Sequence, residues 1–230
     1  MSKDNKTIEI LQKNLDEDMA WRIRELSILK TKIPRQKGTE QDVLIRAGIT
    51  TLYAHWEGFI KYAAECYLQF VSLRKLNYHE LDYCFVALSS RKSINELIKT
   101  NKFKLQKEMI KNLLDNLENR ASIPYENIIN TKSNLNFEVF TDICTILGID
   151  DSDYQLRQKA IDEQLLTQRN KIAHGKYLTI DYEEYISIYN LVIELIRDFK
   201  DDLLNAAVTE QYKKVKSMVL PNLQCRKFPK

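Results

Sequence analysis

The residues best suited to chemistry in this chain are Arg169, Asn170 and His174, in the stretch QLLTQRNKIAHGKY that covers residues 164–177. At the α-helical period, Arg169 falls in the middle of an apolar stripe, and Asn170 and His174 lie on the edge of that stripe. A guanidinium is costly to bury alone but grips phosphate or carboxylate with two donors. A histidine can exchange a proton near neutral pH. The spacing therefore predicts a helix edge that binds an anion and moves a proton beside it.

Two anions could satisfy Arg169. Glu57 shares an apolar stripe of an earlier helix with Tyr53, and a buried carboxylate needs a cationic or hydrogen-bonding partner. One interpretation is an internal ion pair between Arg169 and Glu57, with His174 as an ordinary residue at a helix C-terminus. The other is an RNA phosphate that enters a cleft. The spacing alone favours the ion pair, because an arginine and a histidine five positions apart occur in many helices.

The elements that must position these residues are all predicted helices. Apolar residues recur at spacings of three and four over residues 6–31, and this helix should end before Pro34. Residues 40–75 carry two neighbouring apolar stripes, which is typical of a central helix buried on most of its circumference. Further helices are expected at residues 136–148, 153–174 and 181–207, with Asn136 as an N-cap and Gly148 and Gly175 at C-termini. The predicted fold class is an all-α helical bundle.

The middle and the end of the chain differ from this pattern. Residues 80–130 show only short helical pieces and then a polar linker, so we expect a helical insertion within a single domain of residues 1–207. Residues 208–230 form a basic tail, for which a solvated terminus is favoured over a segment that adds RNA affinity. Its basic residues are Lys213, Lys214, Lys216, Arg226, Lys227 and Lys230.

The composition limits the kind of protein. The net charge of +3, from 35 basic and 32 acidic residues, is too small for the whole surface to bind a polyanion, so any RNA site must be local. Four separated cysteines and three widely spaced histidines do not suggest a zinc site, and neither a metal nor another cofactor is expected. No apolar run approaches the ~18 residues of a membrane span, and the start lacks a secretory signal. A cytoplasmic protein without a membrane partner is therefore predicted.

Three blocks of the sequence carry a resemblance. Arg169-x4-His174, with a polar residue directly after the arginine and AHG at the end of the helix, resembles the signature of the HEPN superfamily, whose members are all-helical and often metal-independent endoribonucleases. The resemblance is closest to the bacterial MAE-type HEPN-like nucleases, which also carry LYAHWEGF in an early helix, here residues 52–59, and an SNLN turn, here residues 133–136. Together the blocks imply a HEPN-like helical bundle over roughly residues 45–207.

The resemblance also implies a mechanism. Arg169 would hold the scissile phosphate and offset the charge that grows on its oxygens, and His174 would move the proton of the attacking 2′-hydroxyl or of the leaving 5′-oxygen. Two subunits would pair as a homodimer, so that two motifs face one another across a composite active site. Because the nucleophile belongs to RNA, no metal is needed, the products carry a 2′,3′-cyclic phosphate and a 5′-hydroxyl, and DNA is not cut.

Other residues receive narrower expectations. Asn170 would orient or bind the phosphate, Lys176 would contact the RNA backbone, and Glu57 would hold Arg169 or His174 in place unless it forms a structural ion pair. HEPN toxins silenced by nucleotidyltransferase antitoxins usually have a tyrosine two positions after the histidine, whereas this chain has Lys176 there and Tyr177 one position later. Control by tyrosine adenylylation is therefore not expected.

The resulting hypothesis is a homodimeric endoribonuclease that acts as a toxin or antiphage effector, with an antitoxin or inhibitor protein as a further partner. The alternative is a HEPN domain that binds RNA, nucleotide or a partner protein without catalysis. A helical assembly protein unrelated to RNA would explain the bundle but not the arginine on its apolar stripe.

Overall fold

A computed structural model describes residues 6–99, 102–132 and 134–214. Over these residues the chain is all-α without a β-strand, which confirms the predicted fold class. The α-helices are α1 (Ile8–Lys32), α2 (Thr39–Ser72), α3 (Tyr83–Ile98), α4 (Phe103–Asp115), α5 (Phe137–Leu147), α6 (Gln168–Ala173) and α7 (Tyr182–Val208). Three helical turns of other types join them, namely η1 (Tyr78–Glu80), η2 (Ser152–Arg157) and η3 (Ala160–Thr167).

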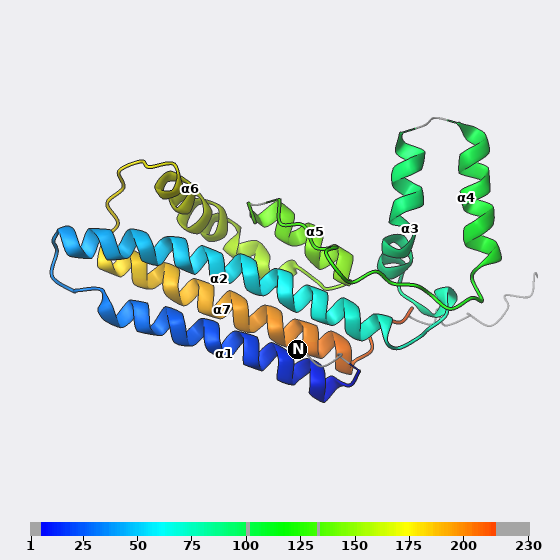
Figure 1. Ribbon diagram of the computed structural model, residues 1–230, viewed down its shortest axis with the longest axis horizontal. Helices are drawn as coiled ribbons and strands as arrows, with labels where there is room; N and C mark the ends of the chain where they lie inside the picture. Colours follow the sequence, from blue (N-terminus) through cyan, green and yellow to red (C-terminus); the bar gives the residue numbers. More distant parts are fainter. Residues whose placement is uncertain (1–5, 100–101, 133, 215–230) are drawn as a thin grey trace, which may run out of the picture.

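The long helices α1, α2 and α7 lie side by side and form the body of the molecule (Figure 1). Helix α2 is the predicted central helix, and it is buried on several sides because apolar residues occupy most of its circumference. The C-cap of α1 is Ile33, directly before Pro34, as expected. Asp181 caps α7 by accepting a hydrogen bond from the Glu184 N–H at 2.7 Å.

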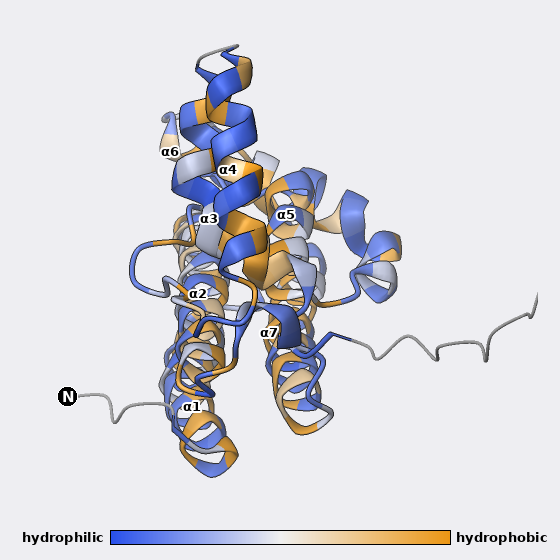
Figure 2. Cartoon of the chain, turned by 90° about the vertical axis from the view of Figure 1, so that its right-hand side faces the viewer, coloured by the Kyte–Doolittle hydropathy of each residue, from blue (hydrophilic) through white to orange (hydrophobic). Residues whose placement is uncertain are grey.

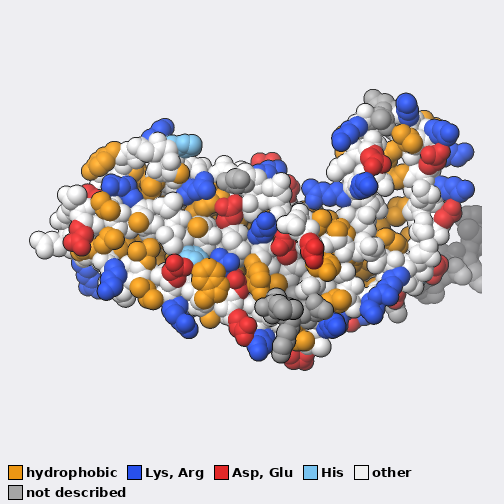
Figure 3. Space-filling model, in the orientation of Figure 1, with side chains coloured by type: hydrophobic (Ala, Val, Ile, Leu, Met, Phe, Trp, Pro, Cys, Tyr) orange, Lys and Arg blue, Asp and Glu red, His pale blue; other side chains and the backbone are white. Residues whose placement is uncertain are grey.

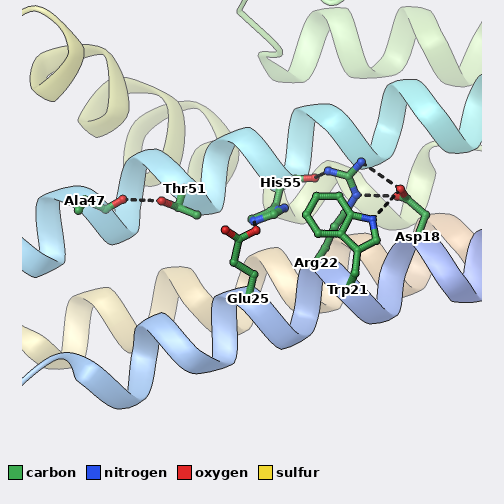
Figure 4. A network of polar contacts seen from close by, with 7 residues as sticks. All are labelled: Asp18, Trp21, Arg22, Glu25, Ala47, Thr51 and His55. Atoms are coloured by element: carbon green, nitrogen blue, oxygen red, sulfur yellow. Dashed lines mark hydrogen bonds and ion pairs between the residues drawn. The ribbon is translucent and has the colours of Figure 1, made fainter.

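A polar network joins α1 to α2 (Figure 4). Asp18 accepts hydrogen bonds from the Arg22 guanidinium, with 2.6 Å from Nε to Oδ2, and Arg22 Nη1 reaches the His55 carbonyl oxygen at 3.4 Å. The His55 imidazole lies with Nε2 2.9 Å from Glu25 Oε2. Burial lowers the pKa of His55, and the Glu25 carboxylate opposes that effect. His55 is therefore part of the packing between α1 and α2.

A second layer of short helices covers α2 and α7. Helix α5, η3 and α6 pack on this side (Figure 1). Asn136 caps α5 by accepting from the Val139 N–H at 2.8 Å, and Gly148 ends it with a left-handed φ of 67°. Both terminal residues were predicted correctly.

The prediction of one continuous α-helix over residues 153–174 is wrong. The structure divides the segment into the 3-10 turn η2, the π-helix η3 and the α-helix α6. A π-helix has i→i+5 hydrogen bonds and therefore more residues per turn, so positions after Leu165 rotate away from the α-helical wheel. Ala173, near the end of α6, is exposed.

Helices α3 and α4 project from one end of the bundle as an arm (Figures 1 and 2). The sequence indicated only short pieces here, whereas α3 already begins at Tyr83. Only Phe85 and Leu88 of α3, and no residue of α4, are buried. Lys and Arg side chains gather on the surface of the arm (Figure 3), where apolar side chains such as Phe103 and Leu114 are exposed as well.

The start of the basic tail is held at the base of this arm. The Tyr212 carbonyl accepts from the Asp82 N–H at 2.9 Å, and the Lys214 N–H donates to the Glu80 carbonyl at 2.9 Å. Lys216, Arg226, Lys227 and Lys230 of the predicted tail, and Cys225, lie outside the described residues. The other cysteines, Cys66, Cys84 and Cys144, form no disulfide within the described part of the chain.

Candidate active site

Three segments that are distant in sequence meet at Arg169. Its Cζ lies 4.3 Å from the centroid of the Tyr53 ring, which comes from α2. Its Nη1 donates to Asn170 Oδ1 at 2.7 Å, and Asn170 Nδ2 donates to Asn134 Oδ1 at 3.1 Å. Residues of the three sequence blocks, namely Tyr53, Asn134 and Arg169, thus converge on one place where α6 packs on α2.

Tyr53 fixes the loop that precedes α5. Its hydroxyl accepts a hydrogen bond from the Leu135 N–H at 2.6 Å, in a buried position. Burial raises the pKa of Tyr53 to about 12, and the Glu57 carboxylate adds to this rise while the Leu135 N–H and Arg169 oppose it. The phenol therefore stays neutral at physiological pH, and Arg169 rests on an uncharged aromatic face.

Glu57 binds the same loop rather than Arg169. Its Oε1 accepts a hydrogen bond from the hydroxyl of Thr131, which is only 8% exposed. Both Glu57 and Arg169 lie within the described part of the chain, and no ion pair joins them there. The internal ion pair is therefore not formed. Glu57 supports the site indirectly, through its contacts with Thr131 and Tyr53.

Arg169 is half-buried and keeps most of its hydrogen-bonding capacity. A guanidinium has about five N–H donors, and one intramolecular hydrogen bond, to Asn170, is formed among the described residues. A positive charge in contact with an aromatic face can still attract an anion, because the ring carries no net negative charge. The geometry suits a phosphate or carboxylate that approaches from outside.

His174 lies at the C-terminus of α6, where the helix ends in a Schellman motif. The Gly175 N–H donates to the Ile172 carbonyl at 3.0 Å and the Lys176 N–H to the Lys171 carbonyl at 2.9 Å. Gly175 adopts a φ of 70°, a conformation that favours glycine. The His174 side chain is exposed, and its imidazole forms no hydrogen bond with any described residue. Both ring nitrogens are available to a substrate.

The segment that carries His174 is basic. Residues 164–180 contain Arg169, Lys171 and Lys176 and no acidic residue. Lys171 and Lys176 are exposed. His174 follows Arg169 by five residues, about 7.5 Å along the helix axis. The segment is thus locally positive although the net charge of the whole chain is small.

The structure thus joins Arg169 and Asn170 by a direct hydrogen bond. His174 and Lys176 are exposed at the end of the same helix. Glu57 is connected to Arg169 only through Tyr53. Sequence reasoning missed the roles of Tyr53, Asn134 and Thr131. Two signals could have identified the first two of them: Tyr53 precedes Glu57 by one turn on the same stripe, and Asn134 belongs to the SNLN block.

Two negative findings concern the described residues alone. No three His, Cys, Asp or Glu side chains in this part of the chain are grouped so that they could hold a metal ion. None of the described helices has both the length and the apolar character needed to cross a membrane.

Comparison with known proteins gives one match. The family model described as RiboL-PSP-HEPN matches residues 17–205, which is most of the chain and includes Tyr53, Glu57, Arg169 and His174. A search of curated proteins and a search of solved structures each found no significant match. The likeness to the MAE-type nucleases in particular stays a prediction. The chain belongs to the RiboL-PSP-HEPN family of the HEPN superfamily.

Proposed function

We propose that this protein is an endoribonuclease that needs no metal and cleaves RNA through attack of the 2′-hydroxyl. HEPN families comprise ribonucleases and RNA-binding modules, so family membership indicates one of these two roles. The observation that carries the choice of a nuclease is the state of Arg169. Its guanidinium rests on Tyr53 without an acidic partner among the described residues, five residues before an exposed histidine.

Each site residue receives a role in this proposal. Arg169 binds the non-bridging oxygens of the scissile phosphate and stabilises the charge that develops on them. The 2′-oxygen forms a bond to phosphorus while the bond from phosphorus to the 5′-oxygen breaks. His174 accepts the proton of the 2′-hydroxyl or donates a proton to the leaving 5′-oxygen. The products are a 2′,3′-cyclic phosphate and a 5′-hydroxyl.

Supporting residues act around this pair. Asn170 orients Arg169 through the hydrogen bond at 2.7 Å and is itself held by Asn134. Glu57 and Thr131 fix the loop that carries Asn134, so Glu57 is a positioning residue. Lys176, exposed beside His174, neutralises an RNA phosphate next to the one that is cleaved.

We further propose that the active form is a homodimer in the cytoplasm. HEPN domains bind RNA and often dimerise. His174 lies on an exposed edge of α6 without an orienting partner among the described residues, and a second subunit that faces this edge would supply both the partner and the other wall of an RNA cleft. In this proposal residues 1–207 form the HEPN unit with residues 80–130 as its insertion, and residues 208–230 are an accessory tail.

The enzyme serves in this proposal as a toxin or antiphage effector that is restrained by an inhibitor protein.

A second candidate is a HEPN module that binds RNA without cleaving it. The observation in its favour is again His174, because catalytic histidines are commonly oriented by a hydrogen bond to their second ring nitrogen and no described residue supplies one here. RNA binding requires Arg169, Lys171 and Lys176 but no proton transfer.

The test is cleavage of end-labelled RNA in excess EDTA by the wild type, Arg169→Ala and His174→Ala. The matched control is His79→Ala, since His79 lies in η1 at the base of the arm and interacts with Glu118. We expect cleavage by the wild type and the control alone, with 2′,3′-cyclic phosphate ends, and no cleavage when the RNA is replaced by DNA. Binding of RNA with no cleavage by any of the four proteins would favour the second candidate.

Expression in a bacterial host tests the toxin role. The wild type should arrest growth, and His174→Ala should be tolerated at the same protein level. Equal tolerance of both forms, in cells where purified wild type from the same culture cleaves RNA, would count against a toxin while leaving the nuclease intact.

A further inference from the structure

Tyr177 is the most exposed aromatic side chain close to the candidate site. It is 80% exposed and follows His174 by three residues. Its position is nevertheless defined, because the Schellman turn at Gly175 directs the chain away from α6 and because the Arg46 guanidinium lies 5.6 Å from the centroid of the Tyr177 ring. One side of the ring is thus backed by a cation, and the rest is open to solvent.

Arg46 itself is positioned by its burial. The side chain is half-buried in α2, and its Nη1 atom is inaccessible to solvent without a hydrogen-bond partner in the described part of the chain. A guanidinium in that state gains from an electron-rich ring stacked against it. Arg46 therefore acts as a support for Tyr177 rather than as a free cation that awaits a phosphate.

The register of α2 places this pair beside the phosphate-binding arginine. Arg46 and Tyr53 are seven residues apart, which is close to two α-helical turns, so they lie on the same face of α2 about 10 Å apart along its axis. Arg169 packs on Tyr53 and Tyr177 packs on Arg46. A nucleotide attached to a phosphate at Arg169 can span this separation.

We infer that Tyr177, supported by Arg46, is a stacking site for an unpaired nucleobase next to the scissile phosphate, and that the substrate is single-stranded or looped RNA. This inference rests on the proposed function, because the position of the stacked base relative to the cleaved bond assumes that Arg169 binds the scissile phosphate. Unpaired bases stack on tyrosine rings and on arginine planes, whereas the faces of bases inside a duplex are covered by their neighbours. Lys176, adjacent in sequence, neutralises the backbone of the same nucleotide.

The test measures binding without catalysis. Fluorescence anisotropy at one fixed salt concentration compares a single-stranded DNA oligonucleotide, which lacks the 2′-hydroxyl, with a hairpin duplex of the same composition. The proteins are the wild type, Tyr177→Phe, Tyr177→Ala and Tyr83→Ala. Tyr83 is a matched control, because it is 67% exposed and has the Lys214 ammonium 4.8 Å from its ring centroid, but lies at the base of the arm.

We expect Tyr177→Ala to bind the single strand about tenfold more weakly, with duplex binding unchanged. Tyr177→Phe keeps the ring and should match the wild type, as should Tyr83→Ala. A fluorescent base analogue in the strand should be quenched by stacking in the wild type and not in Tyr177→Ala. Unchanged single-strand affinity of Tyr177→Ala, or an equal loss for both ligands, would overturn the inference.

Two further readouts distinguish base stacking by Tyr177 from a role in stability or in subunit contact. The melting temperature of Tyr177→Ala should equal that of the wild type, since the side chain is exposed. Its oligomeric state by sedimentation should also be unchanged, and a shift to monomer would overturn the stacking role in favour of contact with a second copy. Absence of RNA cleavage by the wild type would contradict the proposed nuclease, whereas cleavage with no effect of Tyr177→Ala on single-strand binding would contradict the stacking site alone.

Discussion

The Arg169 guanidinium carbon lies 4.3 Å from the centroid of the Tyr53 ring, and this contact decides how the charge on α6 is accommodated. An arginine that is half-buried against a carboxylate would be neutralised within the fold. Against a phenol whose pKa burial raises to about 12, it remains an uncompensated cation. The contact gives Arg169 a fixed place and leaves its charge for a ligand.

The first prediction separates an anion-binding arginine from a structural one. Arg169→Ala should lower the free energy of unfolding by only about 0.5–2 kcal/mol, because a cation–π contact is lost and no buried ion pair is broken. RNA cleavage should fall by about 10²-fold or more. Urea denaturation and initial cleavage rates measure the two effects. A loss of about 3–5 kcal/mol would instead indicate a broken buried ion pair.

Arg169→Lys refines this test. Lysine keeps the positive charge but cannot offer two parallel donors to a phosphate. We expect its stability to resemble that of the wild type, while its cleavage rate lies nearer to that of Arg169→Ala. Full activity of Arg169→Lys would show that charge alone suffices and that the bidentate geometry is unimportant.

The second prediction concerns the hydrogen bond from the Leu135 N–H to the Tyr53 hydroxyl, at 2.6 Å. Tyr53→Phe leaves this buried donor unsatisfied, which costs about 1–3 kcal/mol. The loop that carries Asn134 should loosen, so cleavage should fall as well. Chemical denaturation and hydrogen exchange at Leu135 are the measurements.

Tyr67→Phe is the matched control for that variant. The Tyr67 hydroxyl is buried and, among the described residues, has no hydrogen-bond partner. Its removal should leave the free energy of unfolding unchanged or higher. Equal destabilisation by Tyr53→Phe and Tyr67→Phe would contradict the assigned role of the Leu135 hydrogen bond.

The bundle and its helix ends could be predicted from the sequence because they depend on local patterns. The stripes of α2, the cap at Asn136 and the glycine at position 148 each act within a few residues. The π-helix over Ala160–Thr167 could not be predicted, since an apolar pattern at the 3.6 period does not reveal a wider turn.

The candidate site was predictable only in part for a related reason. Arg169 and His174 stand out within one segment, but the contact from Asn170 to Asn134 joins residues 36 positions apart. The partner of Glu57 is Thr131, in a loop that has no periodic pattern. Long-range polar contacts of this kind follow from the packing of α6 and α5 on α2, which the sequence alone does not give.

The third prediction tests the close approach of α7 to α2. A Cβ at Gly48 would lie 2.6 Å from Tyr185 Cε2, a ring carbon inside the core. Gly48→Ala should therefore destabilise the protein by about 1–3 kcal/mol, although alanine favours helices. Gly38→Ala is the control, because a Cβ there meets nothing within 4 Å and the backbone is extended. Equal melting temperatures for the two variants would contradict the tight packing at Gly48.

The fourth prediction is a pH dependence of stability that arises at His55. Its pKa is lowered, chiefly by burial, so the unfolded chain binds this proton more readily than the folded one. The contribution of His55 to the free energy of unfolding should therefore be fully present above pH ~6.5. As the pH drops below that value, the free energy of unfolding should fall by at most about 1.4 kcal/mol per pH unit for this one group. Urea denaturation between about pH 5 and 8 measures the slope.

His55→Gln is the variant that identifies the source of this slope. Glutamine can still donate to Glu25, which lies 2.9 Å from the imidazole, but it does not titrate. The variant should lose some stability at pH 8, because the ring packs edge-on against Trp21 with 5.1 Å between centroids. Its free energy of unfolding should nevertheless vary less between about pH 7 and 5 than that of the wild type. An unchanged slope would show that His55 is not the titrating group.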